Sequence, residues 1–452
     1  MKELSMQVVN PCCAGIDVGS RFHKVAIDQN RANVKEFGVY TKDHNALIDW
    51  FKASHITSVA MESTGSYWQT LHDALLREGF EVQLVNGNQT KNVKGKKTDV
   101  LDCMWIQKLH SLGLLSGSFL PSADIQCLRT YHRHRQHLIA QCSKYINKMQ
   151  KAMRMMNIRL DVAVNDIMGV SGRAIVEAIL AGETNPVKLA SLANHKIRKS
   201  KEEIALALEG NRREDLLFEL KECLSLHDIY LAKLNECDQE LDTRIQQLLD
   251  AQKSKNKIDA FEKLAKAPSK YSPRMDVETL SLRFYGVNLM AVPGIGAGTL
   301  LCLLTQIGHG FHKFPTSKHF CSWLRLAPNN KITGGKIISS RTPKGKNQFA
   351  LALRHAANSI GNQKEGELVQ FFKRVAYRKD RASAITATAR KLATIVYNMI
   401  TKKEAFNPTT PTALTTKTKN KLIKNIRSKM QALELTKDQL NFLFENSSYS
   451  TT

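Results

Sequence analysis

Apolar and polar residues alternate in short runs along the first quarter of the chain, and these runs predict β-strands. The segment CCAGIDVGSRFHKVAIDQN alternates on both sides of Gly19-Ser20, which predicts a hairpin. ITSVAMES and FEVQLVN predict two more strands, with a helix between them through Leu71 and Leu75. KTDVLDCMWIQKLHSLG predicts a helix capped at its start by Thr98. Strands that lead into helices predict an α/β domain over residues 1–122.

Residues 123–284 are predicted to form a helical and coiled-coil region, which begins with a strongly basic segment. No acidic residue occurs between Asp124 and Asp161, whereas positive side chains recur throughout. A helix with charges of one sign favours a nucleic-acid-binding face, although an ordinary exposed helix is the alternative. The side chains expected to bind nucleic acid here are Arg129, Arg133, Arg135, Lys148 and Arg154.

From 200 to 252 the spacing of apolar residues changes to steps of three, four or seven. The residues of this seam are Leu217, Leu220, Leu224, Leu231, Leu234, Leu241, Ile245 and Leu248. The pattern predicts helix pairing, either within the chain or between subunits. Core packing against flanking helices is an equal alternative.

A C-terminal helical domain is predicted over residues 285–402. Its VPGIGAGT segment has the form of a helix-hairpin-helix turn, in which the amides around Gly294 and Gly296 would grip DNA phosphates. The last part, 403–452, is predicted to be a Thr/Pro-rich linker followed by a short helix over about 421–444. The fold class is therefore α/β plus all-α.

The charge of the chain favours a polyanionic partner. Its 452 residues contain 66 Lys and Arg against 41 Asp and Glu, a formal net charge of +25. A basic protein with no specific partner is the plainer interpretation. No apolar run long enough for a membrane span and no secretory leader is recognised, and the nine cysteines include no CxxC pair. We therefore expect a cytoplasmic protein with no membrane partner.

Four carboxylates occupy strand or helix-start positions where a charge is costly unless it binds a partner or takes part in chemistry. Asp17 lies in the middle of a predicted strand, Glu62 ends another strand, and Asp99 and Asp102 share one face at the start of a helix. Such oxygen ligands suit Mg²⁺. Each acid also has an ordinary alternative, namely a helix cap, a turn acid or an ion pair between Asp17 and Lys24. Just ahead of Asp99, a basic run would meet a phosphate backbone through Lys94, Lys96 and Lys97.

A second group of candidates is the hydroxyl-rich segment KITGGKIISSRTPKGK. No Asp or Glu occurs between Glu278 and Glu365, so acid catalysis at this end must borrow carboxylates from elsewhere. Thr333, on an exposed turn before Gly334-Gly335, is a candidate nucleophile, and a turn-stabilising hydroxyl is the alternative. The cations expected to bind nucleic acid here are Lys331, Lys336, Lys344, Lys346 and Arg354.

The chain resembles the DEDD transposases of insertion sequences, the IS-one-ten family and in particular its IS-one-eleven-eleven branch. The resemblance spans roughly residues 12 to 400 and rests on the order of GIDVGSRFHKVAID, MESTGSYW, KTDVLDCMWIQKL, VPGIGAGTLL, KITGGK, KGKNQFALALRHAA and ITATARKLATIVYN. DNA invertases of the Piv type are related.

This resemblance implies an N-terminal RNase H-like domain of the RuvC type, whose four acids map onto Asp17, Glu62, Asp99 and Asp102 and bind Mg²⁺ or Mn²⁺. It also implies a C-terminal transposase domain with a serine that becomes joined to DNA. Double-stranded donor and target DNA, a noncoding guide RNA and a homo-oligomer (dimer or tetramer) are the implied partners. A bacterial, nucleoid-associated enzyme of DNA cleavage and strand exchange is therefore expected.

One position departs from the family pattern. The serine expected before Gly-Gly-Lys is replaced by Thr333, whose hydroxyl is secondary and more hindered. Thr333 serves as the nucleophile, or Ser339 or Ser340 substitutes, or this copy is weakened; we favour Thr333. Two other functions remain open, a RuvC-type junction nuclease that uses water and an inactive nucleic-acid-binding relic of an element.

Overall fold

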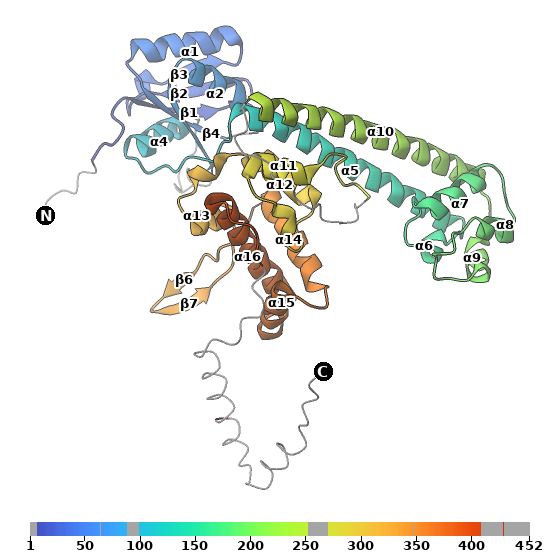
Figure 1. Ribbon diagram of the computed structural model, residues 1–452. Coiled ribbons are helices and arrows are strands. Elements are labelled where there is room, and N and C mark those ends of the chain that lie inside the picture. Colours follow the sequence, from blue (N-terminus) through green and yellow to red (C-terminus); the bar gives the residue numbers. More distant parts are fainter. Residues whose placement is uncertain are drawn as a thin grey trace. The chain divides into compact units, whose positions relative to one another are not determined.

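The computed structural model describes residues 7–63, 65–87, 99–251, 270–345, 347–407 and 428 (Figure 1). The chain divides into two compact units, residues 1–120 and 121–452. The predicted helix over 421–444 lies outside the described residues, apart from residue 428. No helix in the described ranges is long and apolar enough to cross a membrane.

The first unit is a mixed α/β domain built on one five-stranded sheet. Its strands are β1 (Cys13–Val18), β2 (Phe22–Ala26), β3 (Lys35–Gly38), β4 (Ser58–Glu62) and β5 (Glu81–Val85), in the order β3-β2-β1-β4-β5. The predicted hairpin is confirmed, since β1 and β2 pair antiparallel. β3 continues this meander, whereas β4 and β5 run parallel to β1.

Helices cover both faces of this sheet, which explains why β1 is almost wholly apolar. They are α1 (Thr41–Ala53), α2 (Trp68–Arg77) and α4 (Asp99–Ser111), with a short 3₁₀ turn η1 (Arg31–Asn33). Ile16 and Val18 pack with Phe51 of α1 and Leu71 of α2. On the opposite face, Ala60 of β4 packs against α4. Because side chains alternate between the two faces of a strand, every second residue of β1 and β4 faces α4.

Two buried histidines lie between β2 and α1. The rings of His23 and His44 stack with centroids 5.7 Å apart, and neither ring nitrogen of His23 has a hydrogen-bond partner among the described residues. Burial, with a smaller contribution from His44, lowers the pKa of His23 from 6.5 to about 4.

We expect the first unit to lose stability in acid because of His23. The unfolded chain takes up this proton near pH 6.5 and the folded chain only near pH 4. The contribution is therefore complete above pH 6.5 and is lost as the pH falls toward 4, by roughly 3 kcal/mol. Urea unfolding at several pH values should show a weaker pH dependence in His23→Phe than in the parent protein. Equal slopes for both proteins in this window would contradict the assignment.

The second unit is helical, with one small hairpin. Its elements are α5 (Ala123–Met155), α6 (Leu160–Ala163), α7 (Val170–Leu180), α8 (Pro186–Ser191), α9 (Lys201–Leu208), α10 (Glu214–Ala251), α11 (Val277–Tyr285), η2 (Leu289–Ala291), α12 (Ala297–Ile307), η3 (Gly310–Lys313), α13 (Ser317–Trp323), β6 (Lys331–Thr333), β7 (Lys336–Ser339), α14 (Gln348–Gly361), α15 (Glu367–Arg378) and α16 (Arg381–Lys402). Figure 1 shows α5 and α10 as a long pair beside the α11–α16 cluster.

The apolar seam of α10 packs against α5 of the same chain. Leu234 and Cys237 of α10 pack with Leu138 of α5, and Leu220 joins the core that α6 to α9 close. The prediction of helix pairing is thus realised within the chain.

Arg135 corrects one prediction about α5. Its side chain is 2% exposed, and its Nε donates to Asp238 Oδ1 at 2.5 Å while Nη2 donates to the carbonyl of Tyr271 at 2.8 Å. A guanidinium enclosed in this way cannot reach a phosphate. Arg135 is therefore a packing residue between α5 and α10, and the prediction that it binds nucleic acid is wrong.

We expect Arg135→Ala to lower the free energy of unfolding of the second unit by about 3–5 kcal/mol, because Asp238 is left charged and buried. The double variant Arg135→Met/Asp238→Leu, which removes both charges, should recover most of this loss. Urea unfolding followed by far-UV circular dichroism measures both. A single variant as stable as the parent would show that the pair contributes little.

Candidate functional site

Asp17 and Glu62 occupy neighbouring positions at the carboxyl ends of two parallel strands. The register of β1 and β4 pairs Gly15 with Ala60 and Ile16 with Met61, so the next residue along each strand is Asp17 and Glu62. Ile16 and Met61 belong to the core with α1 and α2. Alternation therefore directs both carboxylates to the face that α4 covers, where both are half-buried.

The direction of α4 follows from three contacts with this face. His110, near its end, lies 3.1 Å from the Ser58 hydroxyl, and Gln107 hydrogen-bonds to Cys13. One turn earlier, α4 crosses Gly15, where an added Cβ would lie 2.4 Å from the carbonyl oxygen of Cys103. The helix thus runs opposite to β1, and its first turn approaches the carboxyl ends of β1 and β4.

That first turn carries the other two predicted acids. Asp99 is the first residue of α4, and its side chain lies outside the described atoms; Asp102 is half-buried. Burial raises the pKa of the neighbouring Cys103 thiol to about 12, and the negative charge of Asp17 adds to this rise. Asp17 therefore lies close enough to the start of α4 to act on it electrostatically.

The backbone around these acids leaves little free space. A Cβ on Gly87 would lie within 2.3 Å of Glu62 Oε1, so this carboxylate rests against the chain that follows β5. Lys24 stands opposite Asp17 on β2, and its Nζ lies 2.5 Å from Glu36. Lys24, which the sequence offered as an ion-pair partner for Asp17, therefore forms an ion pair with Glu36.

The donor chemistry of this edge fits a hard divalent cation, because every candidate ligand is a carboxylate oxygen. Among the described side chains, which exclude that of Asp99, no group of three or more His, Cys, Asp or Glu lies close enough to hold a metal ion. The strand register brings two acids to neighbouring positions, and the first turn of α4 supplies the other two. Lys94, Lys96 and Lys97 lie outside the described residues.

Thr333 lies at the tip of the hairpin formed by β6 and β7, which we call the arm (331–339). Thr333 pairs with Lys336 across Gly334 and Gly335, whose φ values of 55° and 75° allow a two-residue turn. Thr333, Lys331 and Lys336 are all exposed. The arm thus presents a hydroxyl between two cations.

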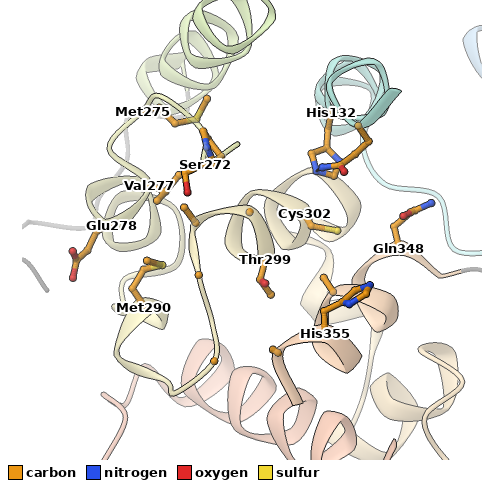
Figure 2. A pocket seen from close by; sticks show the side chains of 18 of the residues that line it. His132, Ser272, Met275, Val277, Glu278, Met290, Thr299, Cys302, Gln348 and His355 are labelled. Atoms are coloured by element: carbon orange, nitrogen blue, oxygen red, sulfur yellow. Dashed lines mark hydrogen bonds between the residues drawn. The ribbon is translucent and has the colours of Figure 1, made fainter. Parts of the chain in front are cut away.

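The VPGIG turn lies between α11 and α12 and lines a cavity of about 720 Å³. Gly294 has a φ of 80°, and its Cα packs so closely on α14 that a Cβ would meet Ile360 at 2.9 Å. Gly296 caps α12, and a Cβ there would meet nothing. Figure 2 shows Thr299 of α12 and His355 of α14 around the same cavity.

His132 of α5 also lines this cavity (Figure 2). Burial, followed by the charges of Arg135 and Arg133, lowers the pKa of His132 to about 4. The imidazole is therefore neutral near pH 7. The start of α12 contributes a partial positive charge to the cavity, which Asp276 and Glu278 also line.

The remaining cations of α5 differ in accessibility. Arg133 and Lys148 are exposed. Arg129 is half-buried and donates to the carbonyl of Gln306 at 2.7 Å, and burial lowers its pKa to about 10. Arg154 forms an ion pair with Asp161 at 2.8 Å. Fewer cations of α5 are therefore free to contact a phosphate backbone than the sequence predicts.

In the C-terminal region the predicted cations are spread over several elements. Lys344 is exposed, Arg354 is half-buried on α14, and Lys346 lies outside the described residues. Sequence reasoning missed a further basic group at the junction of α15 and α16, formed by Lys379 and Arg390. The cation-rich run YRKDRASAITATARK was the available signal.

Comparison with known proteins gives two family matches. Residues 14–158 match the DEDD family of IS110 type, described as "Transposase", and residues 287–372 match the "Transposase IS116/IS110/IS902 family". The first match contains β4, α4 and all of β1 except its first residue, and the second contains the VPGIG turn and the arm.

Two curated relatives illustrate the similarity. The "Insertion element IS110 uncharacterized 43.6 kDa protein" of Streptomyces coelicolor is 29% identical over 113 residues, which cover 25% of this chain and 28% of the relative. The "Pilin gene-inverting protein" of Moraxella lacunata is 33% identical over 132 residues, 28% of this chain and 41% of the relative. The matched segments thus cover less than half of these relatives.

The two matched regions contain all the motifs on which the resemblance rests except ITATARKLATIVYN, which begins after the second match ends. The chain belongs to the IS116/IS110/IS902 family of insertion-sequence transposases.

Proposed function

We propose that this protein cleaves double-stranded DNA and exchanges its strands through a covalent link to Thr333, assisted by the carboxylates Asp17, Glu62, Asp99 and Asp102. The observation that carries the proposal is the edge of the sheet, where Asp17 and Glu62 are neighbours in register and the first turn of α4 approaches both. The family matches support the same reaction class.

The four acids are the proposed ligands of Mg²⁺ or Mn²⁺. Such an ion would stabilise the charge that develops on the phosphate and lower the pKa of an attacking hydroxyl. The chain's own part is to hold the carboxylates on rigid elements, two on parallel strands and two on the helix that crosses Gly15. Because positions on strands and helices are more precise than positions on loops, this edge suits a reaction that needs fixed geometry.

Thr333 supplies the proposed nucleophile. Its oxygen forms a bond to phosphorus while the bond from phosphorus to one deoxyribose oxygen breaks. The threonine proton passes to a base, and the departing oxygen takes up a proton. No Asp or Glu occurs between 278 and 365. We therefore propose that the base is one of the four acids of residues 1–120, in the same copy or another. Lys331 and Lys336 offset the charge on the phosphate.

Further parts of the proposal concern fold and partners. An RNase H-like assignment of the first unit is supported by the antiparallel meander that continues into two parallel strands. Phosphate binding by the VPGIG turn is supported by the open backbone at Gly296. We place a noncoding guide RNA on the exposed face of α5 at Arg133 and Lys148, and we propose a homo-oligomer. Sequencing RNA that copurifies with the protein tests the guide.

The test of the reaction is a search for a protein–DNA adduct that survives denaturation. Incubation of the protein with element-end DNA and Mg²⁺ should yield a species of low mobility in a denaturing gel, with the linkage mapped to Thr333 by mass spectrometry. Nicks that carry free 3′-hydroxyls without an adduct would instead identify a RuvC-type nuclease. Neither product, with guide RNA present, would favour a nonenzymatic relic.

A further inference from the structure

A second cavity lies at the foot of the arm, where β7 ends. It measures about 680 Å³, and three separate parts of the second unit line it. These are the loop before β6, the residues that directly follow β7, and the junction of α15 with α16 (Leu326, Pro328, Ser340, Arg341, Thr342, Phe371, Lys379, Ala382, Ser383, Thr386, Ala387 and Arg390). We call it the arm cavity.

Three cations converge on the arm cavity from distant parts of the sequence. Arg341 follows the arm, Lys379 precedes α16, and Arg390 lies three turns along α16. Within the described ranges, none of these three side chains forms an ion pair with a carboxylate. Asp380 follows Lys379 directly in the chain and interacts with its charge, and it also caps α16 through hydrogen bonds from Ser383. The residues that line the cavity include these three cations and no carboxylate, so its wall is positively charged.

The wall also carries neutral donors. Ser340 and Thr342 line the cavity with hydroxyls that make no hydrogen bond to another described side chain. Leu326 and Phe371 supply apolar surface beside them. Cations and hydroxyls over an apolar floor match the phosphates and sugars of a nucleic-acid strand, since most contacts of such interfaces go to the backbone.

We propose that the arm cavity binds the phosphodiester backbone of the DNA strand beside the phosphate that Thr333 attacks. Ser340 and Arg341 continue directly from β7, so a strand held here lies at the base of the hairpin that carries Thr333. Only the assignment of the strand to the cleaved DNA rests on the proposed function. The binding of a phosphodiester strand rests on the cavity itself.

The test compares DNA binding by the full chain and by the variant Arg341→Ala/Lys379→Ala/Arg390→Ala. Fluorescence anisotropy of a labelled DNA duplex, in EDTA so that no cleavage occurs, gives the affinity at several salt concentrations. We expect the triple variant to bind about thirtyfold more weakly and its salt slope to fall by about two to three. Lys402→Ala, at the far end of α16, is the matched control and should change both little.

A folding defect is separated from a binding defect by the charge-conserving variant Arg341→Lys/Arg390→Lys. This variant should keep most of the affinity, and thermal melting should be alike for all variants. A triple variant with the affinity and salt slope of Lys402→Ala would overturn the proposal. Loss of affinity for a labelled RNA of the same sequence, with DNA binding unchanged, would also overturn it.

The result is separable from that of the adduct test. Thr333→Ala should bind the duplex normally in this assay because the cavity is intact. Loss of affinity in the triple variant without any adduct in the parent protein would leave the cavity assignment standing and remove the proposed reaction. If the triple variant keeps its affinity for DNA and still forms the adduct, the proposed reaction stands and the cavity assignment is removed.

Discussion

Replacing Asp17 by Asn or Glu62 by Gln should reduce the rate of DNA-adduct formation about a thousandfold or more. Both substitutions keep the volume of the side chain and remove its charge, so the sheet edge should stay folded while the affinity for a divalent ion falls. The ion is expected to supply several kcal/mol of stabilisation to the transition state, which corresponds to this factor. The measurement is the initial rate of adduct formation against Mg²⁺ concentration.

The matched control is Asp49→Asn, which removes an exposed carboxylate on α1. Alternation assigns Asp17 and Glu62 to the opposite face of the sheet, so this control should leave the rate unchanged. Rates within a few-fold of the parent in both Asp17→Asn and Glu62→Gln would remove these acids from the reaction. If a higher Mn²⁺ concentration restores activity in either variant, the defect lies in metal binding.

Thr333→Ala should abolish the covalent adduct, because the proposed attacking oxygen is missing. Thr333→Ser should keep the adduct and form it a few-fold faster, since a primary hydroxyl reaches phosphorus with less hindrance than the β-branched threonine. Thr333 is exposed at the tip of the arm, so neither change should affect folding. Gel assays under denaturing conditions measure both variants.

Ser339→Ala and Ser340→Ala are the controls on the same segment. Ser339 is half-buried at the end of β7, and Ser340 lines the arm cavity, so neither stands at the tip. Adduct formation that persists in Thr333→Ala and disappears in one of these variants would move the nucleophile to that serine. If Thr333 is the nucleophile, the linkage in the parent protein should map to Thr333, and only Thr333→Ala should lose adduct formation.

Local patterns were sufficient for the strands of the first unit and for the long helices. The alternation around Gly19-Ser20 predicted the β1–β2 hairpin, and the pairing of its strands confirms it. The same patterns missed β3, a short exposed strand with little apolar contrast. Its residues are exposed or half-buried throughout, so no alternation of buried and exposed positions marks it as a strand, although it pairs with the preceding strand β2.

The sequence by itself determined the family, the position of each acid at a strand or helix end, and the exposed hydroxyl before two glycines, because these depend on residue type and neighbours along the chain. The tertiary structure alone decided which charges are accessible. Arg133 and Arg135 belong to one helix, yet Asp238 on α10 encloses only Arg135. Likewise, Arg341, Lys379 and Arg390 form one cavity only because packing brings distant segments together. Burial and convergence depend on contacts between residues far apart in sequence, and periodicity along one helix or strand does not contain them.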